Sequence, residues 1–247
     1  MPITRRDFLR LSTAALLASA AAPLRAQDAN PLAAQLIRRG RTDLPHVSLT
    51  YDDCWDEAAT LALAEAAAER DLSLTFFPAG LAIRANLERP TEGHEDLYRR
   101  VLDLGHEFGC HLWSHTDISE MDRRTLVGWE VFPWLEALEE ALGEPYIPVG
   151  IRPPFGITTD ALFQAAWRYE QPIILWGGDL KDTFCAPQTC ASEVLARFEK
   201  LMKPGEIFLQ HTIPAAIEIL DDQLSLLAEA GLTHVPLSQI LEELSSV

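Results

Sequence analysis

Basic residues are scarce in this chain. Its 247 residues include 37 Asp and Glu but only 20 Lys and Arg, which gives a formal net charge of −17 with neutral histidines. A field of this sign repels nucleic acid and anionic lipid, so we expect no nucleic-acid partner. Simple solubility is the alternative meaning of the acidic excess, and the sequence leaves both open.

Long apolar runs are also missing after the N-terminus, so we expect no stable membrane span. The one candidate, residues 11–22, is short and flanked by charge. Arg5-Arg6 precedes it and cleavage near Gln27 follows, which predicts a twin-arginine signal peptide over residues 1–26. The twin-arginine translocase would then export the protein to the periplasm or the medium. An amphipathic N-terminal helix is the alternative.

Cysteines number only four, and they allow three pairings between which the sequence cannot choose. Export permits disulfides. Cys185 and Cys190 flank a short loop with a proline, where a bridge is one of two open options. Cys54 and Cys110 stand beside polar clusters, and they are either neighbours in space or small apolar fillers.

The remaining composition is that of an ordinary packed protein, with 48% hydrophobic and 23% charged residues. Residues 27–247 fit one domain. Extended segments are expected at residues 47–51, 73–77, 107–112, 149–152, 173–176, 206–209 and 233–235. Helices are expected at residues 56–70, 95–104, 124–142, 159–169, 192–202 and 215–230, and from 237 onward.

This alternation indicates a parallel sheet with helical crossovers. Seven or eight such units favour a barrel over an open sheet. In barrels of this kind the chemistry lies where strands end and loops begin. Residues 78–94 and 183–190 are the loops expected to shape a groove there.

Two clusters can supply metal ligands. Asp52 and Asp53 follow the first strand, so one carboxylate can bind a metal while the other faces a bound water. His111 and His115 are four residues apart, a spacing that places two imidazoles on one side of a helical turn. Two histidines and a carboxylate with an open fourth position form the pattern of catalytic zinc. A solvated acidic turn and a chance histidine pair are the alternatives.

Two further clusters also follow expected strands. In Arg152-Pro-Pro-Phe155-Gly, the arginine can orient a carboxylate and a backbone N–H can face an oxyanion. Asp182 and His211 follow two later strands, and a histidine near a carboxylate can act as a general acid. The alternative for the first cluster is a rigid loop whose arginine makes only a surface ion pair. The alternative for the second is a histidine with a purely structural role.

Taken together, these clusters resemble the five ordered motifs of the polysaccharide deacetylase family, the NodB-homology domains of carbohydrate esterase family 4. The motifs here are TYDD (50–53), HLWSH (111–115), RPPFG (152–156), DLKD (179–182) and LQH (209–211). The resemblance implies a distorted (β/α)7, TIM-like barrel of a single domain. It also implies a hydrolase that acts on carbon–nitrogen bonds of acetylated sugars.

Site roles carry over by matching position, as implications of that resemblance. They make Asp52 the general base, Arg152 its orienting partner, His211 the general acid, Asp182 the residue that tunes it, the Phe155 N–H the oxyanion donor, Asp53, His111 and His115 the metal ligands, and Leu209 a wall of the acetyl pocket.

The chain departs from the family pattern at two informative positions. Leu112 replaces a serine or threonine, so a hydrogen bond that steadies the ligand loop is expected to be missing, with weaker metal binding as the consequence. Thr183 replaces a tryptophan of the pocket, so one apolar wall is either absent or supplied elsewhere, and Trp176 or Phe184 can supply it.

We therefore predict an N-deacetylase of an N-acetylated glycan of the chito-oligosaccharide, peptidoglycan or exopolysaccharide type. The predicted cofactor is Zn2+, with Co2+, Ni2+ or Mn2+ as alternatives because two histidines and a carboxylate accept several metals. Two other functions stay open. One is a related metal-dependent hydrolase of a small amide or N-acyl compound, and the other is a non-catalytic glycan-binding relative.

Overall fold

The computed structural model describes residues 30–246, and all statements on structure concern them. Residues 31–246 belong to one compact unit. The predicted signal peptide, residues 1–26, lies outside the described residues. No helix within residues 30–246 has both the length and the apolar character needed to cross a membrane.

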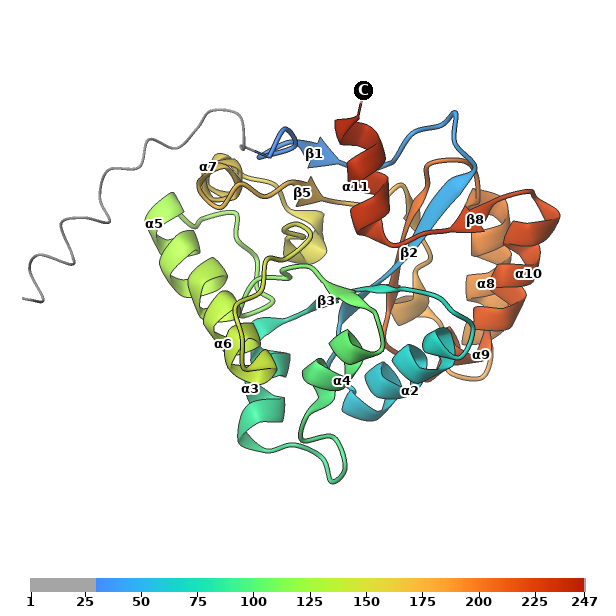
Figure 1. Ribbon diagram of the computed structural model, residues 1–247, viewed down its shortest axis with the longest axis horizontal. Coiled ribbons are helices and arrows are strands. Elements are labelled where there is room, and N and C mark those ends of the chain that lie inside the picture. The colour runs from blue at the N-terminus through green and yellow to red at the C-terminus, as the bar shows by residue number, and fades with distance from the viewer. Residues whose placement is uncertain (1–29, 247) are drawn as a thin grey trace, which may run out of the picture. The chain divides into compact units, whose positions relative to one another are not determined.

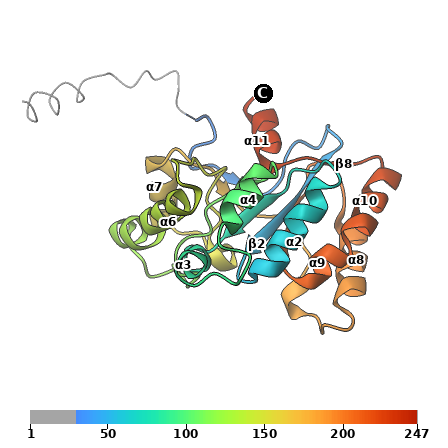
Figure 2. The same ribbon diagram turned by 60° about the horizontal axis from the view of Figure 1, so that its bottom comes forward.

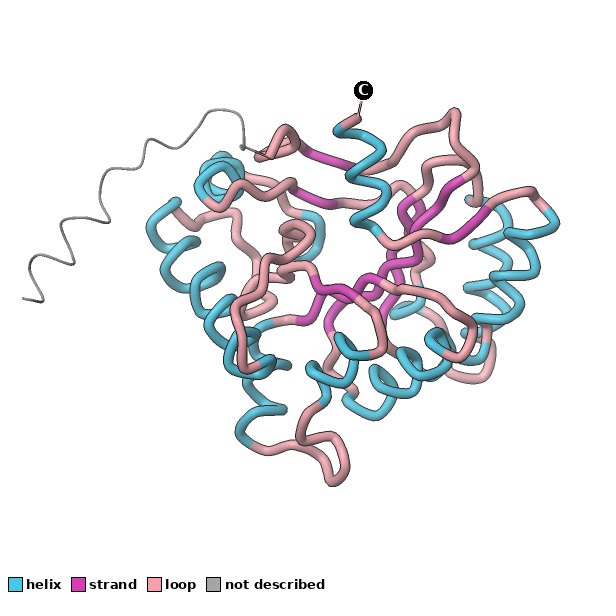
Figure 3. The backbone as a smooth tube through the Cα atoms, viewed as in Figure 1, coloured by secondary structure: helices cyan, strands magenta, loops and turns pink. Residues whose placement is uncertain are grey.

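Parallel strands form the centre of the unit, and helices lie around them (Figures 1 and 3). The longest strand, β2 (His46–Asp53), pairs in parallel with β3 (Thr75–Pro78) on one side. On the other side it pairs with β7 (Ile207–His211), and its first two residues pair with β8 (Thr233–His234). Six of its eight residues are buried and the two at its ends are half-buried, as expected for a strand covered on both faces.

The series of pairings comes back on itself. From β3 it continues through β4 (Glu107–Phe108), then by single bridges from Cys110 to Ile151 and on to β5 (Ile173–Ile174). Four residues later the same segment, as β6 (Gly178–Asp179), pairs with β7. The short β1 (Leu36–Ile37) pairs with β5 outside this ring.

Each of these parallel segments leads into one or more helices. The helices are α2 (Glu57–Ala68), α3 (Gly80–Glu88), α4 (Leu97–Asp103), α5 (Arg123–Leu126), α6 (Phe132–Leu142), α7 (Asp160–Arg168), α8 (Cys190–Leu201), α9 (Pro214–Glu218), α10 (Leu220–Glu229) and α11 (Leu237–Ser245). Within the described residues this makes seven strand–helix units with interrupted strands, which confirms the predicted α/β class and its distorted barrel.

Two apolar clusters hold the unit together. The larger one packs the outward face of β2, with Val47, Leu49 and Tyr51, against α2 and its neighbours. Figure 2 shows α2 and α4 lying across this face. The smaller cluster joins Phe77 and Ile174 of the strands to α11, which crosses one end of the strands in Figure 1. That end is closed by apolar contacts, so the opposite, carboxyl end is the open one.

Several predicted elements need correction. Residues 78–94 contain helix α3 and not a groove-forming loop. The helix begins at Gly80, a residue type that does not indicate a helix in the sequence, and its buried residues pack inward. The strand predicted at 107–112 ends at Phe108, and the one at 149–152 reduces to a bridge at Ile151. The segment predicted as a single helix at 215–230 is divided at Ile219 into α9 and α10.

Candidate active site

The two adjacent carboxylates at the end of β2 point to different partners. Asp52 is buried, and one of its oxygens accepts a hydrogen bond of 2.6 Å from Arg152 Nη1. Asp53 has a left-handed backbone, with φ of 73°, so the strand ends there and its side chain turns away from that of Asp52. Strand alternation and this turn together separate the two carboxylates into two environments.

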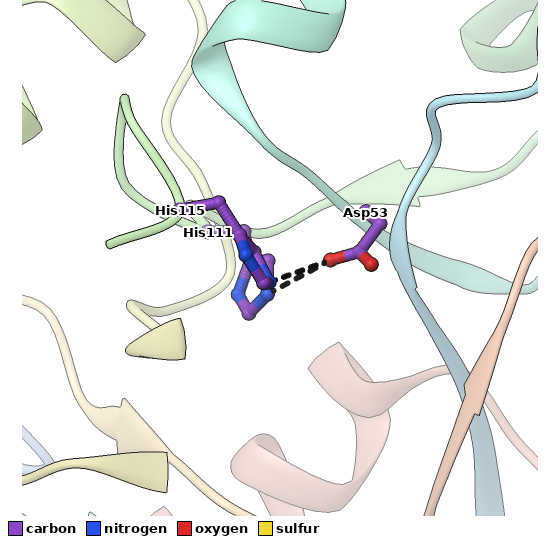
Figure 4. A group of neighbouring side chains, drawn as sticks. All are labelled: Asp53, His111 and His115. Atoms are coloured by element: carbon purple, nitrogen blue, oxygen red, sulfur yellow. Dashed lines mark ion pairs between the residues drawn. The ribbon is translucent and has the colours of Figure 1, made fainter. Parts of the chain in front are cut away.

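Both histidines of the HLWSH motif face Asp53. The Nε2 atoms of His111 and His115 lie 3.3 and 3.1 Å from Asp53 Oδ1, as Figure 4 shows. These three ligand atoms lie within 4.8 Å of one another. The segment that carries the histidines is a loop and not the helical turn expected from their spacing, because Leu112 and His115 adopt left-handed φ values of 60° and 53°.

The hydrogen bonds of this cluster suit a cation. His111 Nδ1 lies 2.8 Å from the carbonyl oxygen of Arg152, which can only accept, so Nδ1 carries the proton and the Nε2 lone pair faces Asp53. Asp53 Oδ1 is buried and has no hydrogen-bond partner of its own among the described residues. Two acceptors facing each other at 3.3 Å repel unless a proton or a cation lies between them. The three residues therefore fit a divalent metal.

The charges of the cluster shift the pKa values accordingly. Burial raises the pKa of Asp53, but the nearby imidazoles of His111 and His115 outweigh this effect and hold that pKa well below its usual range. The close contact with the Asp53 carboxylate raises the pKa of His115. A carboxylate kept ionised in a largely buried place is what a metal ligand requires.

A fully buried arginine supports Asp52. Arg152 Nη1 also donates to Thr50 Oγ1 at 2.8 Å, and its guanidinium lies 4.0 Å from the centre of the Phe77 ring. Burial lowers the pKa of Arg152, while the charge of Asp52 opposes that effect. A buried guanidinium paired with one carboxylate holds that carboxylate in one orientation.

The second acid–base pair joins β7 to the 3-10 turn Asp182–Phe184. Asp182 Oδ1 lies 2.8 Å from His211 Nδ1, and Oδ2 accepts the His211 backbone N–H at 2.6 Å. Burial lowers the pKa of His211, but the hydrogen bond and charge of Asp182 outweigh it and raise that pKa to about 9. His211 Nε2 lies 3.9 Å from Asp53 Oδ2, so the imidazole faces the metal cluster.

One cavity of about 370 Å³ connects these groups. It is lined by Asp52, Asp53, His111, His115, Phe155, Trp176, Asp179, Lys181, Thr183, Phe184, Leu209 and His211. The buried Arg152 and Asp182 lie directly behind it, so all ten residues predicted for the site come together. Both Trp176 and Phe184 line the wall near Thr183, whereas no residue of the predicted loop 78–94 lines this cavity.

Backbone strain concentrates around the cavity. Among the described residues other than glycine, nine have positive φ, and six of them belong to or adjoin the motifs: Asp53, Cys54, Leu112, His115, Phe155 and Lys181. Such conformations cost about 1–3 kcal/mol each and persist where the surroundings enforce them. At Phe155 this turn sets the direction of the peptide N–H in the RPPFG motif.

Three residues near the site escaped the sequence analysis. Trp55 is half exposed and its ring packs edge-on against His115, and Ser114 lies between the two histidines. Glu130 is buried and accepts hydrogen bonds from the loop that carries both histidines. The sequence does contain a signal for Glu130, because it is a lone carboxylate among the apolar residues Leu126, Val131 and Trp134 of one helical face.

The cysteines divide into a bridge and two thiols. Cys185 and Cys190 form a disulfide, one of the options that the spacing left open. Cys54 and Cys110 are free and buried, and burial raises the pKa of both thiols. They are therefore small apolar fillers beside the ligands and not a second bridge.

Comparisons with known proteins identify relatives of this chain. The chain is 25% identical over 199 residues to peptidoglycan-N-acetylglucosamine deacetylase PgdA of Listeria monocytogenes, a match that covers 80% of this chain and 39% of that protein. It is 29% identical over 177 residues to a chitooligosaccharide deacetylase of Sinorhizobium fredii, covering 71% of this chain and 75% of the relative. The chain thus spans well under half the length of the first of these relatives.

Solved structures share the fold. A carbohydrate esterase family 4 pseudoenzyme from Bacillus anthracis superposes with a TM-score of 0.75 at 22% identity, over 86% of this chain and 70% of that one. At this identity the likeness concerns the fold alone. The model of the family described as polysaccharide deacetylase matches residues 39–173, more than half of the chain. The chain therefore belongs to the polysaccharide deacetylase family, as its motifs predicted.

Proposed function

We propose that this protein is a metal-dependent N-deacetylase that hydrolyses the acetamido groups of an N-acetylated glycan. The observation that carries the proposal is the convergence of three sets on one cavity, namely Asp53 with two histidines, Asp52 with Arg152, and His211 with Asp182. Family membership supports the reaction class. Relatives named as peptidoglycan and chitooligosaccharide deacetylases support a peptidoglycan or chito-oligosaccharide substrate, and an exopolysaccharide is the third substrate type that we consider.

Asp53, His111 and His115 would hold the metal, which we take to be Zn2+, with Co2+, Ni2+ or Mn2+ as alternatives. When bound, such an ion polarises a carbonyl oxygen and lowers the pKa of a water molecule. The hydrogen bond from His111 Nδ1 to the Arg152 carbonyl oxygen keeps the ring oriented for this task.

Asp52 would act as the general base. Its Oδ1 is held by Arg152, which leaves Oδ2, 3.7 Å from His111 Nε2, to accept a proton from the attacking water. The water oxygen then bonds to the acetyl carbon, and the Phe155 N–H donates to the oxygen of the resulting tetrahedral intermediate. A donor of this kind is worth roughly 3–4 kcal/mol in the transition state.

His211 would act as the general acid. Its Nδ1 is engaged by Asp182, so Nε2 delivers the proton to the sugar nitrogen as the carbon–nitrogen bond breaks. Acetate and a free amino sugar are the products. The pKa of about 9 keeps this imidazole protonated at neutral pH, as a proton donor requires.

The walls of the cavity suit a sugar that carries a small acyl group. Leu209 and Trp176 would bound the pocket for the acetyl methyl group. Phe155 and Phe184 are exposed at the rim, at 64% and 81%, and their ring faces can cover the apolar face of a pyranose. Phe184 thereby takes over the wall that Thr183 leaves open.

Export would place this activity outside the cytoplasm. We propose that residues 1–26 form a twin-arginine signal peptide, and that the remaining chain acts as a periplasmic or secreted enzyme after translocation. A disulfide between Cys185 and Cys190 is consistent with an oxidising compartment.

The test is acetate release by the mature protein, measured with and without zinc, on acetylated chito-oligosaccharides and peptidoglycan fragments. We expect metal-dependent release that a chelator abolishes and added metal restores. Release from small N-acyl compounds but from no glycan would favour the amidohydrolase alternative. Glycan binding by zinc-loaded protein without acetate release would favour a non-catalytic relative and contradict the proposal.

A further inference from the structure

A buried carboxylate outside the five motifs holds the loop between the two histidines. Glu130 is 3% exposed. Its Oε2 accepts the backbone N–H groups of Trp113 and Ser114 at 3.0 and 2.9 Å, and its Oε1 accepts the Ser114 hydroxyl at 2.6 Å. All three bonds go to residues that lie between His111 and His115 in the chain.

A π-helical turn carries this side chain. The helix that starts as α5 widens at Val127–Val131 before it continues as α6. Such turns are rare and occur mostly as single bulges at functional sites. The turn is held close to the strands, because Trp134 Nε1 donates to the carbonyl oxygen of Pro78 at the end of β3. Glu130 therefore reaches the loop from a rigid support.

The loop is gripped from its other side as well. Gly80 and Leu81, at the start of α3, donate their N–H groups to the carbonyl oxygens of Leu112 and Trp113 at 2.8 and 2.9 Å. A Cβ atom on Gly80 would lie 2.8 Å from Trp113 Cα, so only glycine allows this approach. Glu130 thus accepts hydrogen bonds from the N–H groups of the loop, and the first residues of α3 donate hydrogen bonds to its carbonyl oxygens.

The loop needs such support because its conformation is costly. Leu112 and His115 both have left-handed φ values, although neither is glycine. Each such residue costs about 1–3 kcal/mol. The imidazole rings lie 5.1 Å apart, between centres, only while both residues keep this conformation. A relaxed loop would separate the two Nε2 atoms.

We propose that Glu130 is a positioning residue that sets the metal affinity of the site by fixing the HLWSH loop. The inference rests on the proposed function, since it assumes that His111 and His115 bind the metal. It also explains how the chain tolerates Leu112, because the hydrogen bonds expected from a hydroxyl at that position are supplied by Glu130 and Ser114.

Geometry and charge can be separated at this position. In Glu130→Gln the amide oxygen can accept hydrogen bonds from both backbone N–H groups, and the amide nitrogen can donate to Ser114 Oγ. The Ser114 hydroxyl can then donate to Thr116 Oγ1, which lies 2.8 Å from Ser114 Oγ. The glutamine thus keeps every contact without the charge. Glu130→Asp keeps the charge but withdraws it by one methylene, and Glu130→Ala leaves two buried N–H groups unpaired.

The experiment is a zinc titration of the mature protein against a chelating competitor, with the melting temperature of each metal-free variant as a check on folding. We expect Glu130→Ala and Glu130→Asp to raise the Kd for zinc roughly 10- to 100-fold, the range for groups that orient metal ligands. Glu130→Gln should stay within about threefold of the wild type by the same reasoning. Glu136→Gln, on the exposed face of α6, is the matched control and should not change the Kd.

Two results would overturn the inference. One is a wild-type Kd in Glu130→Asp or in a folded Glu130→Ala variant, which would make the contacts irrelevant to the metal. The other is a loss in Glu130→Gln as large as in Glu130→Ala, which would assign the effect to charge. A wild type that binds no zinc while Asp53→Asn behaves identically would instead refute the metal site itself, and so the proposed function.

Discussion

At the scale of single residues, the pair Asp52-Asp53 illustrates how one peptide unit can separate two roles. Asp52 keeps the strand conformation and meets Arg152 behind the cavity, while Asp53 has positive φ and meets the histidines. The two aspartates have the same side chain, so their different partners account for their different proposed roles. Substitution of each should therefore affect a different measurement.

Asp52→Asn should lower turnover strongly without loss of metal. An asparagine oxygen can still accept from Arg152, so the fold and the zinc ligands are kept, but the proton acceptor is gone. We expect kcat to fall roughly 10²- to 10⁴-fold, the contribution of a general base. Zinc content and acetate release measured on one preparation provide the check. Asp53→Asn should lose the zinc as well, and wild-type turnover in Asp52→Asn would refute the assignment of the base.

The residues of the site were predictable one at a time because each follows a strand. Asp52, Arg152 and His211 stand at positions where parallel strands must end on the same side, so their meeting needs only the fold class. Glu130 was not predictable in this way. Its use depends on a π-helical turn, and no residue type in Val127–Val131 marks such a turn in the sequence.

At the scale of elements, the same limit appears in the HLWSH segment. A spacing of four suggested a helical turn, but the two histidines converge through a loop with two left-handed residues. Tertiary contacts from α3 and Glu130 determine that conformation. The local spacing of residues in the sequence does not indicate these contacts. The residue types of the segment predicted that its histidines would converge, but they did not predict its backbone.

The bridged segment after β6 is the element that supports His211, the proposed general acid. Both sulfur atoms of the Cys185–Cys190 bridge lie close to the carbonyl oxygen of Asp182, at 3.0 and 3.2 Å. Asp182 in turn holds His211 through two hydrogen bonds. The bridge therefore joins the start of α8 to the turn that carries this carboxylate.

Replacement of both Cys185 and Cys190 by serine should weaken this support. The bridge closes a short loop, so its loss should lower the free energy of unfolding by about 2 kcal/mol. We expect a several-fold fall in kcat with an unchanged Kd for zinc, because the metal ligands belong to other segments. Mild reduction of the wild type should reproduce the effect, and the serine variant should not respond to the reductant. An unchanged kcat in the variant would exclude a role of the bridge in the acid pair.

At the scale of the described domain, the ends of the strands serve opposite purposes. The site lies at the carboxyl ends, whereas the amino ends are joined by two histidines, the buried His106 and the half-buried His234. His234 accepts the Leu49 N–H at Nδ1 and donates from Nε2 to the Ser73 carbonyl oxygen. His106 does the same between Leu74 and Ala64. Both rings bond as neutral imidazoles, so neither has a place for a second proton.

Low pH should therefore destabilise the folded protein, because protonation of these two histidines breaks hydrogen bonds at the amino ends of the strands. Burial lowers the pKa of His234 to about 4 from 6.5, and the charge of His106 adds to the effect. The pKa of His106 is lowered by burial too. Because the folded pKa lies below the unfolded one, the stabilisation is complete above pH 6.5 and is lost as the pH falls towards 4. For His234 alone the loss between pH 7 and pH 5 is roughly 2 kcal/mol.

Urea unfolding at pH 7 and pH 5 tests this at the scale of the whole domain. His234→Gln can keep both hydrogen bonds without a titrating group, so its free energy of unfolding should change less between the two pH values than that of the wild type. The difference should be roughly 2 kcal/mol, even if the variant is less stable at pH 7. His94→Gln, at a partly exposed position before α4, is the control and should follow the wild type. The same pH dependence in His234→Gln as in the wild type would show that acid acts elsewhere, and the carboxylates around the metal cluster would be the next groups to examine.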